Sequence, residues 1–170
     1  MVTPSSPVEA PAFPGSSAAM VFAPPASAAA AASVLRILLV EDSPVNQKIA
    51  VGMLHRLGHV AAIADDGRAA LALLQKKRFD LVFMDVEMPE MDGPEATREL
   101  RALLPRPWQP VVVAVTAHTD RTMHDRLIAG GMDACLTKPL QIGELAKILV
   151  GFPELLAQRL KARRLSPTAG

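Results

Sequence analysis

Five side chains in this sequence have the types and the placement to bind a metal ion and to act on phosphate. Each directly follows a short aliphatic run that is typical of a buried strand. They are Glu41 and Asp42 after residues 34–40, Asp85 after 79–84, Thr116 after 111–115, and Lys138 after 133–136. Because ligands of open parallel sheets bind outside the carboxyl ends of the strands, we expect these side chains to meet at one edge.

Three carboxylates held together repel one another and raise one another's pKa, and a hard divalent cation relieves this repulsion. Oxygen ligands with an incomplete shell suit Mg²⁺, with Mn²⁺ as a possible substitute. An aspartate beside such a metal can attack phosphorus, while Lys138 neutralises charge on the phosphoryl oxygens. A single Asp at a strand end is more often a cap, so the prediction depends on all four strand ends together.

The segments that must position these residues alternate in pattern. Strands are expected over 34–40, 59–64, 79–84, 111–115 and 133–136, and helices over 44–57, 67–77, 95–104, 120–129 and 142–150. Five strands that alternate with five helices predict an α/β fold, a doubly wound parallel sheet with helices on both faces.

The composition changes at both ends of this pattern. Residues 1–32 contain six prolines and eleven alanines with no periodicity, which predicts a disordered linker. We expect one domain over 33–152. Residues 153–170 carry four basic residues against one acidic residue and form a basic tail, with a short helix expected before a disordered end.

Composition also limits location and partners. The net charge of +1 favours neither nucleic acid nor a membrane surface. No apolar run approaches the ~20 residues that span a bilayer. The single cysteine allows no internal disulfide and fits a reducing compartment. We therefore expect a cytoplasmic protein, monomeric or weakly dimeric.

Four motifs together resemble one family. Residues 38–47 (LLVEDSPVNQ) and 83–93 (FMDVEMPEMDG) are similar to the start and the phosphoacceptor segment of response-regulator receiver domains, and 115–117 (VTA) and 136–140 (LTKPL) complete the set in order. The resemblance covers about 120 residues and is closest to receivers of hybrid sensor histidine kinases. It implies a flavodoxin-like receiver fold with strand order 2-1-3-4-5 and a cis peptide bond between Lys138 and Pro139.

The resemblance also implies a role for each site residue. Asp85 would be the phosphoacceptor, and Thr116 and Lys138 would contact the phosphoryl group with the backbone N–H groups of Val86 and Ala117. The implied metal ligands are Asp42, Asp85, Glu41 through water, and the backbone carbonyl of Glu87.

One residue departs from the family pattern, and two others lie where they could affect the lifetime of the phosphoryl group. Cys135 stands where the family usually has Tyr or Phe, which makes switching by an aromatic ring doubtful and suits a relay carrier. Its thiol is expected to be a small buried hydrophobe. Glu87 and His118 lie two residues after Asp85 and Thr116, and either could tune the phosphoryl lifetime or simply face solvent.

The partner implied by the resemblance is a histidine kinase or a histidine phosphotransfer protein. The expected docking face is the first helix with the loop after the fifth strand: Pro44, Val45, Lys48, Val51, Pro139 and Leu140. The chain could be a single-domain regulator or the receiver of a hybrid kinase. We expect a signalling receiver that promotes only its own phosphotransfer and dephosphorylation and is not an enzyme, and this expectation is open only if the chain is a fragment of a hybrid histidine kinase. A metal-dependent phosphatase with an aspartyl-phosphate intermediate remains an alternative because Glu87 has the offset of its second acid. A flavin module is less favoured, since no phosphate loop follows the first strand.

Overall fold

Five short aliphatic segments form one parallel sheet. The computed structural model describes residues 35–165, with side chains through residue 161, so the linker predicted over 1–32 and the end of the predicted tail lie outside it. The strands are β1 (Ile37–Val40), β2 (Ala61–Ala64), β3 (Leu81–Asp85), β4 (Val111–Thr116) and β5 (Ala134–Thr137). Their order is β2-β1-β3-β4-β5, which confirms the predicted topology.

Helices connect the strands, and most begin at a side-chain cap. They are α1 (Pro44–Arg56), α2 (Gly67–Lys76), α3 (Gly93–Leu103), α4 (Arg121–Ala129) and α5 (Ile142–Leu165), with a short 3₁₀ helix at Arg106–Trp108. Asp66, Asp92 and Asp120 each accept a hydrogen bond from a backbone N–H three residues later. Ser43 does the same for α1, and Pro44 occupies the first helical turn, as the sequence predicts.

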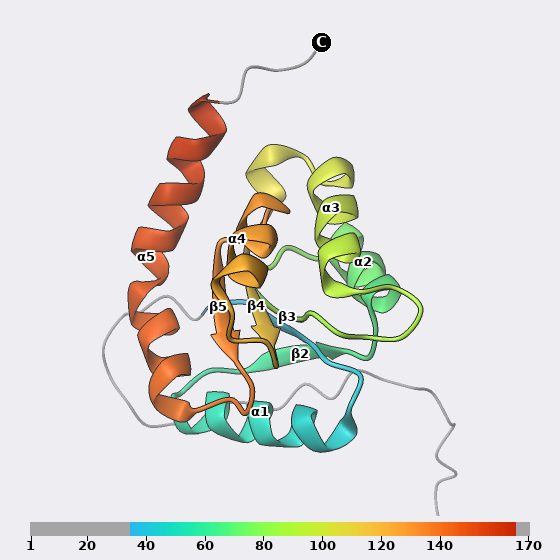
Figure 1. Cartoon of the computed structure of the whole chain (residues 1–170), viewed down its shortest axis with the longest axis vertical. Coiled ribbons are helices and arrows are strands. Elements are labelled where there is room, and N and C mark those ends of the chain that lie inside the picture. Colours follow the sequence, from blue (N-terminus) through green and yellow to red (C-terminus); the bar gives the residue numbers. More distant parts are fainter. Residues whose placement is uncertain (1–34, 166–170) are drawn as a thin grey trace, which may run out of the picture.

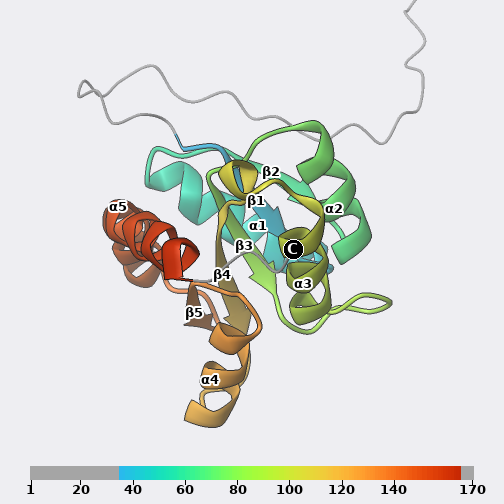
Figure 2. The same ribbon diagram turned by 90° about the horizontal axis from the view of Figure 1, so that it is seen from above.

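Alternate residues of each strand pack on opposite faces of the sheet. Leu38, Val82 and Val112 belong to the core cluster that α2, α3 and α4 cover. Leu39, Phe83 and Val113 belong to the cluster under α1 and α5. Figure 2 shows the sheet between these two helical layers. Since strands covered on both faces have no polar side, they read as continuous apolar runs in the sequence.

Helix α5 is longer than the predicted 142–150 and continues through Pro153 to Leu165 (Figure 1). The residues after Val150 still have partners on the domain, since Phe152, Leu155 and Leu156 pack against the second core cluster. Arg159 Nη1 lies 2.8 Å from Asp133 Oδ1. The helix predicted within the tail is therefore the continuation of α5, held by packing that a local pattern does not reveal.

Candidate functional site

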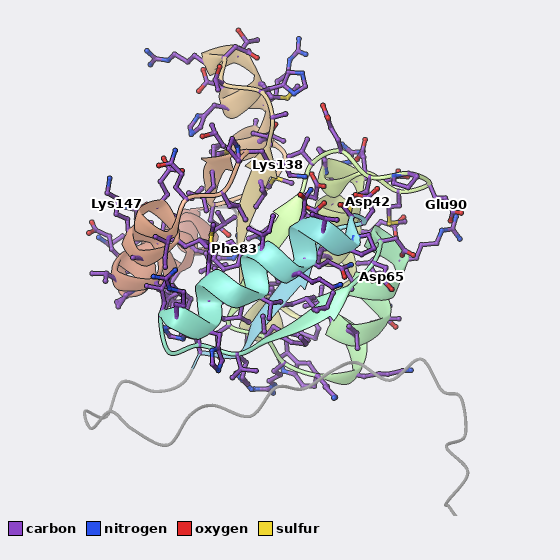
Figure 3. All side chains as sticks on the ribbon, turned by 90° about the horizontal axis from the view of Figure 1, so that it is seen from below. Asp42, Asp65, Phe83, Glu90, Lys138 and Lys147 are labelled. Carbon is purple, nitrogen blue, oxygen red and sulfur yellow. The ribbon has the colours of Figure 1, made fainter. Side chains whose placement is uncertain are left out.

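The sheet order brings the carboxyl ends of β1, β3, β4 and β5 to one edge. Val40 pairs with Met84, and Thr116 pairs with Thr137, so the residues that follow these strands are neighbours. Figure 3 shows Asp42 and Lys138 at this edge, above the start of α1. The convergence predicted from the sequence is present in the structure.

Three carboxylates gather at this edge. Glu41, Asp42 and Asp85 each offer an oxygen, and these oxygens lie within 4.8 Å of one another. Asp85 and Glu41 are only 2% and 4% exposed, whereas Asp42 is open to solvent. Hard oxygen donors at this spacing, with one side open, fit a magnesium ion that keeps several of its waters.

Lys138 joins two of the carboxylates. Its Nζ lies 2.6 Å from Asp85 Oδ2 and 2.9 Å from Glu41 Oε2. The peptide bond between Lys138 and Pro139 is cis, which confirms the expectation. The lysine therefore supplies a positive charge between the two buried carboxylates of the cluster.

Burial and the lysine act in opposite directions on these groups. Burial raises the pKa of Asp85 above its usual value, and the nearby Glu41 adds to this, although Lys138 opposes both. For Glu41, burial alone would raise the pKa, but hydrogen bonds from Asn46 and Lys138 outweigh it and the pKa is lowered. Burial would lower the pKa of Lys138, but its bonds to both carboxylates raise it instead. The lysine thus stays protonated at neutral pH.

The first turn of α1 holds Glu41. Asn46 Nδ2 donates to Glu41 Oε1 at 2.9 Å, and Gln47 Nε2 donates to the Glu41 backbone carbonyl at 2.7 Å. Neither amide was among the site residues predicted from the sequence. The available signal was two amide side chains one helical turn after the acidic pair, but their direction depends on the turn between β1 and α1.

Gly93 lets the chain return close to Asp85 after the β3–α3 loop. A Cβ at position 93 would collide with the backbone carbonyl oxygen of Asp85. Gly93 N also donates to the Val86 carbonyl at 3.1 Å. Glycine is therefore required here by close approach of the backbone, and it keeps the α3 N-terminus against the strand that carries Asp85.

The backbone donors beside Asp85 differ from the prediction. Val86 N donates to the Val115 carbonyl at 2.9 Å, so this N–H belongs to the β3–β4 ladder and is not available to a phosphoryl group. Glu87 N instead lies 3.2 Å from Asp85 Oδ1. The assignment of Val86 was therefore wrong, because the ladder continues one residue past the strand end. No contact of the structure tests the assignment of Ala117.

Thr116 is buried at the end of β4, and the two residues named for lifetime tuning are more exposed. Thr116 is 3% exposed, and its Oγ1 accepts a hydrogen bond from His118 N at 3.1 Å. His118 Nδ1 lies 3.2 Å from Glu87 Oε1, and both side chains are about half exposed. The loops that follow β3 and β4 therefore contact each other through these two side chains.

Cys135 is half-buried and packs against the core cluster under α2, α3 and α4. Burial raises the pKa of its thiol. A raised pKa disfavours the thiolate that redox chemistry needs, so the structure agrees with a packing role.

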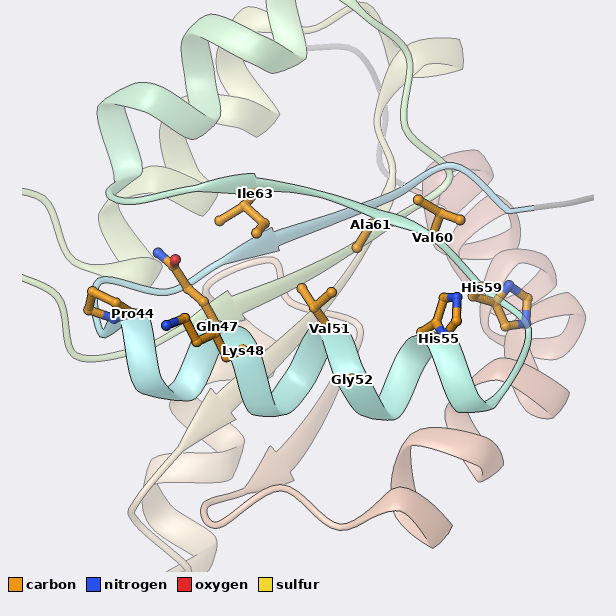
Figure 4. A pocket seen from close by; sticks show the side chains of 10 residues that line it. All are labelled: Pro44, Gln47, Lys48, Val51, Gly52, His55, His59, Val60, Ala61 and Ile63. Carbon is orange, nitrogen blue, oxygen red and sulfur yellow. The ribbon is translucent and has the colours of Figure 1, made fainter. Parts of the chain in front are cut away.

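The residues of the predicted docking face divide between two sides of α1. Pro44, Lys48 and Val51 line a groove of about 530 Å³ between α1 and β2, shown in Figure 4. A second groove, of about 350 Å³, lies at the active edge between α1 and the loop after β5. It is lined by Glu41, Asn46, Ile49, Lys138, Pro139 and Leu140. Two large apolar side chains of α1 are exposed: Ile49, which lines this second groove, is 49% exposed, and Val45 is 65% exposed.

Comparison with known proteins identifies the family. Residues 37–150 match the response regulator receiver domain. This chain belongs to that family. Among receiver-containing proteins, the sensor histidine kinase AruS of Pseudomonas aeruginosa is 39% identical over 122 residues, which cover 71% of this chain and 12% of AruS. ArcB of Escherichia coli is 37% identical over 118 residues, covering 69% of this chain and 15% of ArcB.

Solved receiver structures share the fold. The receiver of sensor histidine kinase PA1611 from P. aeruginosa is 35% identical to this chain, with a TM-score of 0.63. The match covers 71% of this chain and 98% of the PA1611 receiver, which is described with a magnesium ion in its active-site cleft. Vibrio cholerae CheY4 is 30% identical with a TM-score of 0.64, over 69% of this chain and 98% of its own. The protein is a receiver domain of two-component or phosphorelay signalling, and the phosphatase alternative is not favoured. Among the described residues, no helix has both the length and the apolar character to cross a membrane.

Proposed function

We propose that Asp85 of this receiver accepts a phosphoryl group from a phosphohistidine, with Mg²⁺ bound at Glu41, Asp42, Asp85 and the Glu87 carbonyl. The observation that carries the proposal is the contact of Lys138 Nζ with Asp85 Oδ2 at 2.6 Å, beside two further carboxylates within 4.8 Å. The ion in the PA1611 receiver supports the choice of magnesium.

The transfer needs little covalent chemistry from the protein. A carboxylate oxygen of Asp85 forms the new O–P bond as the N–P bond to the donor histidine breaks, and the imidazole nitrogen keeps the electron pair. Lys138 moves its charge from the carboxylate to the phosphoryl oxygens, and Thr116 and the N–H groups of Glu87 and Ala117 bind them. A bound magnesium ion would neutralise further charge on the phosphoryl group.

We assign the donor to a histidine kinase or a histidine phosphotransfer protein, and the docking surface to Val45, Ile49, Pro139 and Leu140. Ile49, Pro139 and Leu140 line the groove that leads to Lys138, and Val45 on the first turn of α1 is 65% exposed. Pro44, Lys48 and Val51 instead line the groove on the other side of α1. Ile49→Asp should slow transfer from a phosphorylated partner but leave labelling by a small phosphodonor intact. Loss of both reactions would instead indicate damage to the site.

The similarity to hybrid kinases favours the receiver of a larger signalling protein over a single-domain regulator. Phosphohistidine is made with ATP, so the proposal places the receiver in the cytoplasm, where it turns over no substrate of its own. Glu87 and His118 would tune the phosphoryl lifetime by limiting access of water to Asp85. Dephosphorylation rates of Glu87→Ala and His118→Ala, each followed after removal of the donor, test this role.

The test of the whole proposal is intact mass spectrometry after incubation with acetyl phosphate or phosphoramidate. With Mg²⁺ present, the wild-type chain should gain one phosphoryl group, and Asp85→Asn should gain none. Labelling should also be lost when EDTA removes the metal. Equal labelling of both proteins would exclude Asp85 as the acceptor, and steady turnover of small phosphate esters would revive the phosphatase alternative.

A further inference from the structure

The acidic loop after β1 is held by two amide side chains of α1. We propose that Asn46 and Gln47 are positioning residues for the metal site: Asn46 fixes the carboxylate of Glu41, and Gln47 fixes its main chain. This inference rests on the proposed function, because it assigns a role to these residues through the metal that the acidic cluster would hold.

Asn46 completes the hydrogen bonding of Glu41. Glu41 Oε2 is held by Lys138 Nζ at 2.9 Å, and Oε1 accepts from Asn46 Nδ2 at 2.9 Å and from Ser43 N at 3.3 Å. Both oxygens of a carboxylate that is 4% exposed therefore have partners before any ion arrives. The side chain of Glu41 is long and flexible, so its position depends on these contacts.

Gln47 acts on the backbone of the same residue. Its Nε2 donates to the Glu41 carbonyl at 2.7 Å and to Asp65 Oδ1 at 2.8 Å. An amide nitrogen carries two hydrogens, so both bonds form together. Figure 4 shows the Gln47 side chain rising from α1 towards the strands. The loop after β1 is thereby tied to the loop after β2, and the Glu41-Asp42 backbone is fixed from the side away from Lys138.

The expected effect follows from the role of groups that orient metal ligands. Their removal commonly weakens metal binding by about 10- to 100-fold. Glu41 is expected to contact the ion through water, so we expect the low end, about tenfold, for Asn46→Ala. Helix α1 itself should persist, since Ala is a better helix former than Asn and the Ser43 cap bonds the backbone of residue 46.

The test is the Mg²⁺ dissociation constant, measured by calorimetry on the full chain at neutral pH. Asn46→Ala should bind Mg²⁺ about tenfold more weakly than the wild type, and Arg56→Ala, on the last turn of α1, should bind like the wild type. In a Glu41→Ala background, adding Asn46→Ala should change nothing further, because its target is gone. Gln47→Leu should still weaken binding in that background, because its acceptor is the backbone carbonyl.

The outcomes separate the two proposals. A wild-type chain that binds no Mg²⁺ would refute the proposed function itself. If the wild type binds Mg²⁺ and Asn46→Ala binds it equally well, the positioning role is overturned. The same holds if Asn46→Ala weakens Mg²⁺ binding by the same factor in the wild-type chain and in the Glu41→Ala background. Circular dichroism of each variant checks that α1 is retained, and Asn46→Ser, which keeps a donor, should recover part of the affinity if the hydrogen bond is the cause.

Discussion

Replacement of Lys138 by methionine removes the one positive charge that lies between two buried carboxylates. Without it, Asp85 and Glu41 face each other with oxygens within 4.8 Å. Two unit charges at that separation repel by about 3 kcal/mol at an effective dielectric constant of about 20. In the wild type, the attraction of Lys138 to both carboxylates offsets this repulsion, and the substitution removes that attraction. Loss of one partner of a buried ion pair commonly costs about 3–5 kcal/mol. In the absence of metal and near pH 7, we therefore expect Lys138→Met to lower the free energy of unfolding by about 3 kcal/mol, the low end of that range, because the Lys138 side chain is 25% exposed.

The loss of stability in Lys138→Met should be smaller at lower pH. The variant can escape the repulsion by protonating Asp85, which costs about 1.4 kcal/mol for each pH unit above the usual pKa of about 3.9. That cost is about 4 kcal/mol near pH 7 and about 1.5 kcal/mol near pH 5, so protonation limits the loss at the lower pH. The folded pKa of Asp85 is already raised by burial, and it rises further in the variant. The folded variant then holds a proton that the unfolded chain releases, so its stability must fall as pH rises.

Urea unfolding in EDTA, near pH 5 and near pH 7, measures the difference in the free energy of unfolding between the wild type and Lys138→Met. Lys147→Met on α5 is the matched control. Lys147 is exposed and distant from the acidic cluster, as Figure 3 shows. A loss for Lys138→Met that equals the control, or one that is larger near pH 5 than near pH 7, would refute the electrostatic reasoning.

Two further predictions concern the frame around the site. Gly93→Ala should destabilise the domain by about 2 kcal/mol, because the added methyl group collides with the Asp85 carbonyl. Thermal unfolding measures this destabilisation, and an unchanged melting midpoint would contradict the prediction. Arg159→Ala should release the C-terminal part of α5, since Arg159 binds Asp133 and Gln109 at 2.8 Å each. Hydrogen exchange should then show lost protection after Pro153 only, and unchanged protection there would mean that packing alone holds the helix.

The topology could be predicted because the sheet is covered on both faces. Its strands are continuous apolar runs that alternate with helical patterns, which predicts a parallel sheet with polar residues at the carboxyl ends of its strands. The strand order β2-β1-β3-β4-β5, which brings Asp85 and Lys138 together, was implied by the resemblance to receiver domains. The direction of individual polar groups could not be predicted in the same way. The ladder bond of Val86 to Val115 depends on strand register, which no local pattern reports.

Helix α1 also shows that a local sequence pattern does not settle which side chains are buried. Its apolar residues repeat at helical spacing, and Ala50 and Leu54 are buried as that spacing requires. Ile49 fits the pattern equally well but is 49% exposed and lines the groove beside Pro139, where no other element covers it. A periodic pattern gives the helix and its approximate inner face, whereas the boundary of that face depends on which neighbours cover it.

The first turn of α1 combines tasks that are separate in the sequence. Ile49 faces solvent at the groove where a donor protein is proposed to dock, while Asn46, which lines the same groove, holds Glu41. A docked partner would exclude water from the Asn46–Glu41 hydrogen bond and strengthen the placement of the carboxylate. Binding free energies are reciprocal, so the factor by which a partner then raises magnesium affinity is the factor by which magnesium raises partner affinity. Asn46→Ala removes the connecting bond and should reduce this coupling, measured as the ratio of Mg²⁺ dissociation constants with and without a saturating partner; a ratio unchanged from the wild type would contradict the argument.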